Sequence, residues 1–225
     1  MGLEGASYAD ILAFYYPGTT LSAKGSGVRW TRIEGKKVTL FSTQPVQEAK
    51  FLPVIEDLLR RGESRLHSSI RSGVRVYLYP DVETFRNVMG EPGWIEAVSS
   101  GDRIDVQPAS LLESLGTFHA TLYHELLHVL AEEEAAPSVP IWFREGLVSW
   151  LTSPRSSGSQ ARPLDFAPIA RSDESVTRDS YAAAVSEIRE LANRYGEGAL
   201  LGWLKSGLPA EVSRSIASNP ATKSR

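Results

Sequence analysis

The stretch His124-Glu125-Leu126-Leu127-His128 carries the residue types and spacing that point most directly to chemistry. Four residues make about one turn of α-helix, so both imidazoles project from the same face and can share one metal ion. Glu125 is offset around the helix, where it can reach a metal-bound water without displacing a histidine. Zinc lowers the pKa of such a water to roughly 7, so a nearby carboxylate can accept its proton at neutral pH. The pattern predicts a zinc site.

The surroundings of this motif favour metal binding over a chance match. The chain has four histidines, and two of them are His124 and His128. They interrupt an otherwise apolar helical stretch, where an unpartnered buried histidine would be costly. The alternative is a helical interaction domain without metal, in which both histidines titrate freely or pack in the core.

A catalytic zinc site needs a third protein ligand and one open position. Glu145 lies in the next expected helix, after a connection that can turn the chain back, and Gly146 would let the two helices approach closely. A carboxylate on an antiparallel neighbour would complete a set of two histidines and one glutamate. The alternative is that Glu145 is solvated and that Glu132, Glu133 or Glu134 is the ligand. His119 lies about 140° around the helix from His124 and is a poor ligand.

The remaining pattern predicts strands first and helices second, hence an α+β domain. We expect a hairpin from 28–33 and 37–42, a helix over 45–61 that Pro53 kinks or breaks, a strand at 74–79 and a short helix to Met89. A turn and a strand at 103–106 follow. Three helices are expected at 112–134, 140–151 and 181–195, with a loop over 153–180.

Composition excludes several classes of protein. With 42% hydrophobic residues, the 225-residue chain can bury a core, and a net charge of −3 gives no basic face for nucleic acid. The absence of cysteine excludes disulfides, iron–sulfur clusters and cysteine-ligated zinc. No apolar run is long enough to be a transmembrane segment, and residues 1–10 lack the features of a signal peptide.

HELLH, a short loop and Pro140-x-Trp142-Phe143-x-Glu145-Gly146-Leu147 together resemble the gluzincin metallopeptidases, and more narrowly the peptidase MA-like domains of bacteria. The resemblance covers roughly residues 28–208. It implies a zincin-like metallopeptidase domain with a small N-terminal sheet and a mainly helical half that carries the HExxH helix. It also implies that His124, His128 and Glu145 are zinc ligands and that Glu125 is the catalytic base. The best-studied gluzincins have an Asp one turn after the ligand Glu, where this chain has Ser149.

A second resemblance concerns residues 2–21, GLEGASYADILAFYYPGTTL, which look like the end of a SpoIID/LytB (amidase-enhancer) domain. The domain organisation expected is a remnant of that domain at 1–22, a linker at 23–27, the peptidase domain at 28–212 and a flexible tail at 213–225. This resemblance implies a bacterial cell-envelope setting, an extracytoplasmic parent protein, and possible contact with cell-wall material through a missing N-terminal domain.

Together these patterns predict a zinc-dependent hydrolase that cleaves a peptide or protein substrate, with an endopeptidase favoured because no signal for holding a free amine is present. The substrate could pair with the strand 103–106 as an edge strand. A donor to the oxyanion is expected, and Tyr181 is the candidate, a core aromatic being the other reading. The rival function is a zinc-stabilised binding module of a larger envelope protein that lacks activity.

Overall fold

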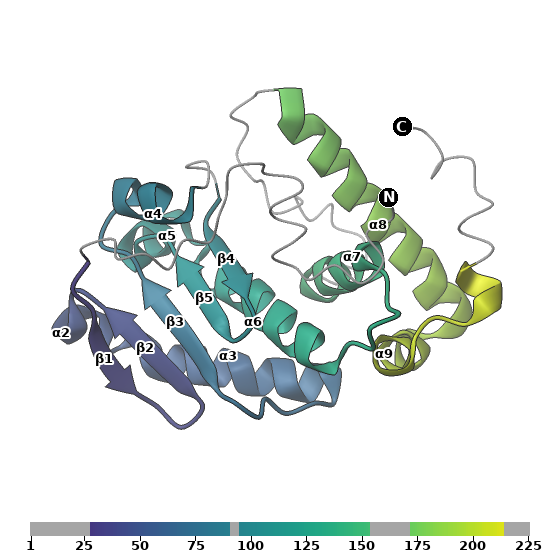
Figure 1. Ribbon diagram of the computed structural model, residues 1–225, viewed down its shortest axis with the longest axis horizontal. Coiled ribbons are helices and arrows are strands. Elements are labelled where there is room, and N and C mark those ends of the chain that lie inside the picture. Colours follow the sequence, from purple (N-terminus) through teal and green to yellow (C-terminus); the bar gives the residue numbers. More distant parts are fainter. Residues whose placement is uncertain (1–27, 91–94, 154–171, 214–225) are drawn as a thin grey trace.

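The computed structural model describes residues 28–90, 95–153 and 172–213, and describes side chains in the last range only from residue 184. The elements in these ranges, shown in Figure 1, are β1 (Thr31–Glu34), β2 (Val38–Ser42), α2 (Pro45–Glu48), α3 (Phe51–Leu66), β3 (Val74–Leu78), α4 (Val82–Met89), β4 (Ala97–Ser100), β5 (Arg103–Val106), α5 (Ala109–Leu115), α6 (Phe118–Glu134), α7 (Ile141–Thr152), α8 (Ser172–Tyr195) and α9 (Glu197–Ser206). A small sheet therefore precedes a mostly helical remainder, which confirms an α+β chain. The expected segments 1–22 and 23–27 lie outside the described residues, as does all of the tail except Ser213.

The five strands form one mixed sheet in the order β1-β2-β3-β5-β4. β1 and β2 form the expected antiparallel hairpin, β3 runs parallel to both β2 and β5, and β4 closes the sheet antiparallel to β5. The expectation that 103–106 is an edge strand is wrong, because β5 lies between β3 and β4. The edge strands are β1 and, beside β5, β4, which we did not expect as a strand of its own.

Helices α3 and α6 pack against each other and against one face of this sheet (Figure 1). Alternate residues of β2 and β3 point toward them, and Val38, Leu40, Val76 and Leu78 are almost fully buried. α6 is apolar on nearly every side because it is covered by the sheet, α3 and α7 at once. The motif helix is thus the central element of the core.

Two helix boundaries differ from the expectation for local reasons. The predicted helix over 45–61 is broken into two helices, but the break lies ahead of Pro53, between Glu48 and Phe51. Pro53 lies in the first turn of α3, where its missing N–H costs nothing, and it does not kink that helix. The predicted helix over 112–134 is also two, because Gly116 takes a left-handed conformation (φ 74°) that ends α5.

The helices that follow the motif are longer and more numerous than expected. α7 matches the predicted 140–151 closely, but α8 begins at Ser172, inside the predicted loop over 153–180. α9 follows Gly196, where we expected only the end of a helix. Its Leu200, Leu201 and Leu204 are buried, so it belongs to the core.

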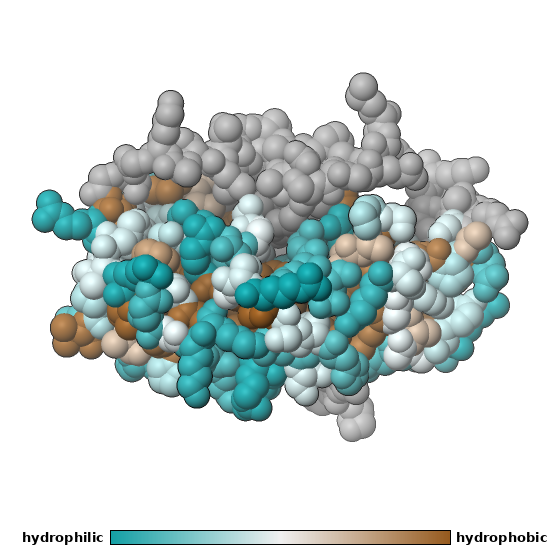
Figure 2. All heavy atoms as spheres, turned by 60° about the horizontal axis from the view of Figure 1, so that its bottom comes forward, coloured by the Kyte–Doolittle hydropathy of each residue, from teal (hydrophilic) through white to brown (hydrophobic). Residues whose placement is uncertain are grey.

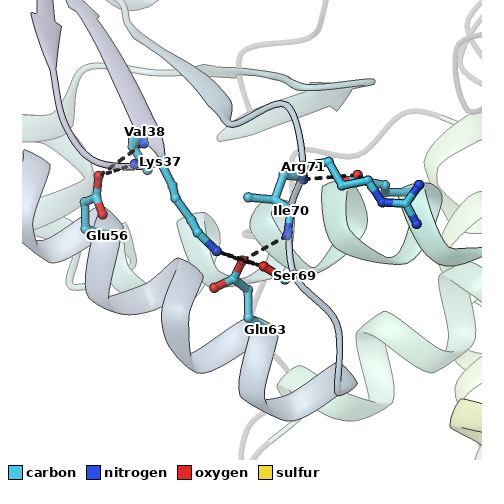
Figure 3. Close-up of polar contacts among 8 residues, drawn as sticks. Lys37, Val38, Glu56, Glu63, Ser69, Ile70 and Arg71 are labelled. Atoms are coloured by element: carbon cyan, nitrogen blue, oxygen red, sulfur yellow. Dashed lines mark hydrogen bonds and ion pairs between the residues drawn. The ribbon is translucent and has the colours of Figure 1, made fainter.

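Two glutamates of α3 hold the hairpin and the loop before β3 (Figure 3). Glu56 Oε1 accepts three consecutive backbone N–H groups of the hairpin, from Lys36 (2.6 Å), Lys37 (2.9 Å) and Val38 (3.1 Å). Glu63 Oε1 accepts from Lys37 Nζ at 2.6 Å and from the Ile70 N–H at 2.9 Å. Both carboxylates therefore fix the sheet to the helical layer.

The surface on the α3 side mixes hydrophilic side chains with separated hydrophobic ones, as Figure 2 shows. No helix in the described ranges combines the length and the apolar character needed to cross a bilayer.

Candidate metal centre

The two histidines of the motif meet on the side of α6 that faces α7. His124 Nε2 and His128 Nε2 lie 3.0 Å apart, and His128 Nε2 lies 3.6 Å from Glu145 Oε2 of α7. The structure therefore brings all three predicted ligands to one place. Glu145 and His128 are both more than nine-tenths buried.

The three glutamates that could have replaced Glu145 point elsewhere. Each of them contacts a cationic residue outside the site, in the pairs Glu132–Arg144, Glu133–Arg71 and Glu134–Lys205. The other candidate histidine, His119, is exposed and contacts the ring of Phe118. Among the residues weighed, only Glu145 has a carboxylate directed to the histidine pair.

The donor set has the right chemistry for zinc, and the two donor separations that the structure gives lie near the separation expected at a zinc site. Two nitrogen ligands at about 2.05 Å from a tetrahedral zinc lie about 3.3 Å apart. The observed separations of 3.0 Å and 3.6 Å bracket this value. Among the described residues, no group of three or more His, Cys, Asp or Glu side chains is arranged to hold a metal ion as it stands. At the candidate site the imidazoles of His124 and His128 are in hydrogen-bond contact with each other. A small separation of the two rings would be needed to admit a cation.

Burial keeps both histidines neutral, which is the state that binds a metal. It lowers the pKa of His124 to about 4. It also holds the pKa of His128 well below its usual value, and the charges of His124 and Arg144 lower it further.

Glu125 belongs to α6, and its carboxyl points toward the edge strand β4. Burial raises the pKa of its carboxyl to about 7, and the nearby hydroxyl and backbone N–H of Ser99 lower it in part, although the Ser99 hydroxyl makes no hydrogen bond among the described residues. Its Oε2 is buried and has no hydrogen-bond partner among the described residues. A carboxyl with a pKa near 7 can both accept and return a proton at neutral pH.

The edge strand is tied to the start of the motif helix. The carboxylate of Glu96, just before β4, accepts hydrogen bonds from Thr117 Oγ1 at 3.0 Å and from Thr121 Oγ1. Gln107 N–H donates to the Glu96 carbonyl at 2.9 Å, so by alternation the backbone groups of Ala97 and Ser99 point away from β5. Glu125 therefore lies beside the outer edge of the sheet.

Sequence reasoning missed Thr152 and Ser99. Thr152 Oγ1 lies 3.3 Å from His124 Nδ1, on the last residue of α7. Its position seven residues after Glu145, two helical turns along the same face, was the available signal. For Ser99 the sequence offered no such signal, because the strand β4 that carries it was not expected. Tyr181 falls within α8, but its side chain lies outside the description, so its predicted role stays a prediction.

Comparisons of the chain with family models, curated proteins and solved structures found no match.

Proposed function

We propose that this chain is a zinc-dependent peptidase with a zincin-like fold that hydrolyses peptide bonds. The observation that carries the proposal is the convergence of His124, His128 and Glu145 from two helices, with Glu125 buried beside them. A zinc ion held by these three side chains would polarise the scissile carbonyl and make water a stronger acid.

Glu125 is the base of this proposal. Its Oε2 would take the proton from the attacking water and then deliver it to the leaving amine, which balances the protons over the reaction. The position of Glu125 beside Ser99 supports this role, because it places the carboxyl next to the strand along which a substrate would lie.

The substrate of the proposed peptidase would be an extended chain added to β4. An edge strand offers its outward N–H and C=O groups to an extended peptide, and in β4 these are the groups of Ala97 and the C=O of Ser99, since the Ser99 N–H already donates to Glu125. Such a peptide would run past Glu125, which favours an endopeptidase. The cell-envelope and extracytoplasmic setting, and any contact with cell-wall material, rest only on the resemblance of residues 2–21 to a SpoIID/LytB domain.

The test is zinc content by elemental analysis, together with hydrolysis of fluorescently labelled casein, on protein purified without chelators. We expect about one zinc per chain in the parent and none in His124→Ala. Glu125→Gln should keep the zinc and lose activity by about 100-fold or more. Glu133→Gln, whose carboxylate contacts Arg71 outside the site, is the matched control and should keep both.

The outcomes separate the possible functions. A parent that takes up no zinc, even when zinc is supplied, refutes the proposal. Zinc without hydrolysis would support the zinc-stabilised binding module instead. Unchanged hydrolysis in zinc-loaded Glu125→Gln would refute the role of Glu125 as the base.

A further inference from the structure

The hydroxyl of Thr152 has two kinds of neighbour. On one side are backbone carbonyls of its own helix, Val148 O at 3.0 Å and Ser149 O at 3.1 Å. On the other side is His124 Nδ1, at 3.3 Å. The contact with His124 links the last turn of α7 to the motif helix α6.

The distances favour one direction for this contact. A threonine hydroxyl has one proton and can accept through its lone pairs. The two carbonyls can only accept, and both lie closer to the hydroxyl than His124 Nδ1 does, so we assign the proton of Thr152 to them. With this assignment the hydroxyl oxygen is the acceptor toward His124, and His124 Nδ1 carries the hydrogen.

A neutral imidazole with a hydrogen on Nδ1 has its lone pair on Nε2. In His124 this nitrogen faces His128 Nε2 at 3.0 Å. The lone pair is therefore directed at the point where the three candidate ligands converge. In the metal-free protein His128 must supply the hydrogen of that contact.

We propose that Thr152 is a positioning residue, which holds His124 in the Nδ1–H tautomer and presents its Nε2 lone pair for metal binding. The inference deepens the proposed function and rests on it for the zinc ligation. It places the histidine-orienting group at Thr152 and not at Ser149, where the gluzincin resemblance would put it. The atom of Ser149 that enters this network is its carbonyl oxygen, which accepts from the hydroxyls of Thr152 and Ser153.

The test uses Thr152→Val, which keeps the shape and removes the acceptor, with Thr152→Ser and Ser149→Ala as matched variants. The first measurement is the imidazole ¹⁵N spectrum of the metal-free proteins, which reports which ring nitrogen carries hydrogen. The second is the zinc dissociation constant, by competition with a chelator of known affinity. The d–d spectrum of Co²⁺-loaded protein reports whether the ligand set is intact.

We expect the parent and Thr152→Ser to show His124 protonated on Nδ1, and Thr152→Val to show a mixture of tautomers. Removing a group that orients a metal-binding histidine costs 10- to 100-fold in metal affinity, and for this neutral contact we expect about 10-fold in Thr152→Val. Thr152→Ser and Ser149→Ala should remain within about twofold of the parent. The Co²⁺ spectrum should keep its shape, because the ligands do not change.

Two results would overturn the inference. One is a parent His124 protonated on Nε2, or an unchanged tautomer in Thr152→Val. The other is a loss of zinc affinity in Ser149→Ala as large as in Thr152→Val. A parent that binds no zinc refutes the proposed function and the zinc part of this inference together. The tautomer of the metal-free protein still decides the orienting contact in that case.

Discussion

Gly146→Ala tests whether the close approach of α7 and α8 requires a glycine at this position. Gly146 faces α8 and not, as we expected from the sequence, the motif helix α6. A Cβ added at Gly146 would lie 2.8 Å from the Ala184 carbonyl oxygen and 2.9 Å from Ile188 Cγ1. Ordinary contacts of a Cβ are 3.4 Å or longer, so α8 would have to move by about half an ångström. The obstacle is backbone, which cannot rotate aside as a side chain can.

The expected cost follows from two opposing terms. Inserting a methyl group into a packed interface costs about 1–3 kcal/mol. Replacing glycine by alanine inside a helix returns about 1 kcal/mol. We therefore expect Gly146→Ala to lower the free energy of unfolding by up to about 2 kcal/mol. Because Glu145 is the adjacent residue, zinc affinity should fall as well.

Two other helical glycines serve as controls in the same denaturation experiment. Gly202 of α9 is exposed and has nothing within 4 Å of its Cβ position, so Gly202→Ala should stabilise the protein by about 0.5–1 kcal/mol. Gly62 of α3 would meet the end of the Leu130 side chain at 2.9 Å, which can move. The free energy of unfolding of Gly62→Ala should therefore lie between those of Gly146→Ala and Gly202→Ala. A Gly146→Ala protein as stable as Gly202→Ala would refute the reasoning.

Two further predictions concern the glutamates of α3 that Figure 3 shows. Glu56→Ala should lower the free energy of unfolding in urea by about 2–3 kcal/mol, because it leaves three hairpin N–H groups without their charged acceptor. The control Asp57→Ala removes an exposed ion pair and should change the free energy of unfolding by less than about 0.5 kcal/mol. Equal effects would contradict this. For Glu63, burial raises the pKa of the carboxyl, but hydrogen bonds and the charge of Lys37 outweigh it and hold the pKa below its usual value. Its stabilisation is therefore present above the unfolded-state pKa and is lost as the pH falls through the folded-state value. The stability difference between the parent and Glu63→Gln should shrink in a urea series from pH 6 to pH 3, and a difference independent of pH would speak against the assignment.

The sequence predicted those parts of the fold whose signals are local and strong. The hairpin, β3 and α7 have clear patterns, and the HELLH spacing brought His124 and His128 together on one helix face. The sequence favoured Glu145 as the third ligand but could not exclude Glu132, Glu133 or Glu134 from that role. What decides it is that each of those contacts a cationic residue distant in sequence.

The parts that could not be predicted depend on tertiary contacts. The strand β4 is four residues, Ala-Val-Ser-Ser, with little β-propensity of its own, and its pairing with β5 and packing on α6 determine it. The break between α5 and α6 is hidden because the apolar pattern continues across Gly116. The spacing of Thr152 from Glu145 places both on one face of α7, but the partner of Thr152 follows only from the antiparallel packing of α7 beside His124.

Besides the contact of His128 with Glu145, two polar contacts among the described residues join α6 to α7, one near each end of the pair. Arg144, in the first turn of α7, bonds Glu132, and Thr152, in the last turn, contacts His124. The two α7 residues are eight positions apart, or about 12 Å along the axis. Two attachments so far apart fix the angle of rotation of α7 as well as its distance from α6. Because one residue of slippage would turn Glu145 by about 100°, these two contacts help to set the direction of its carboxylate.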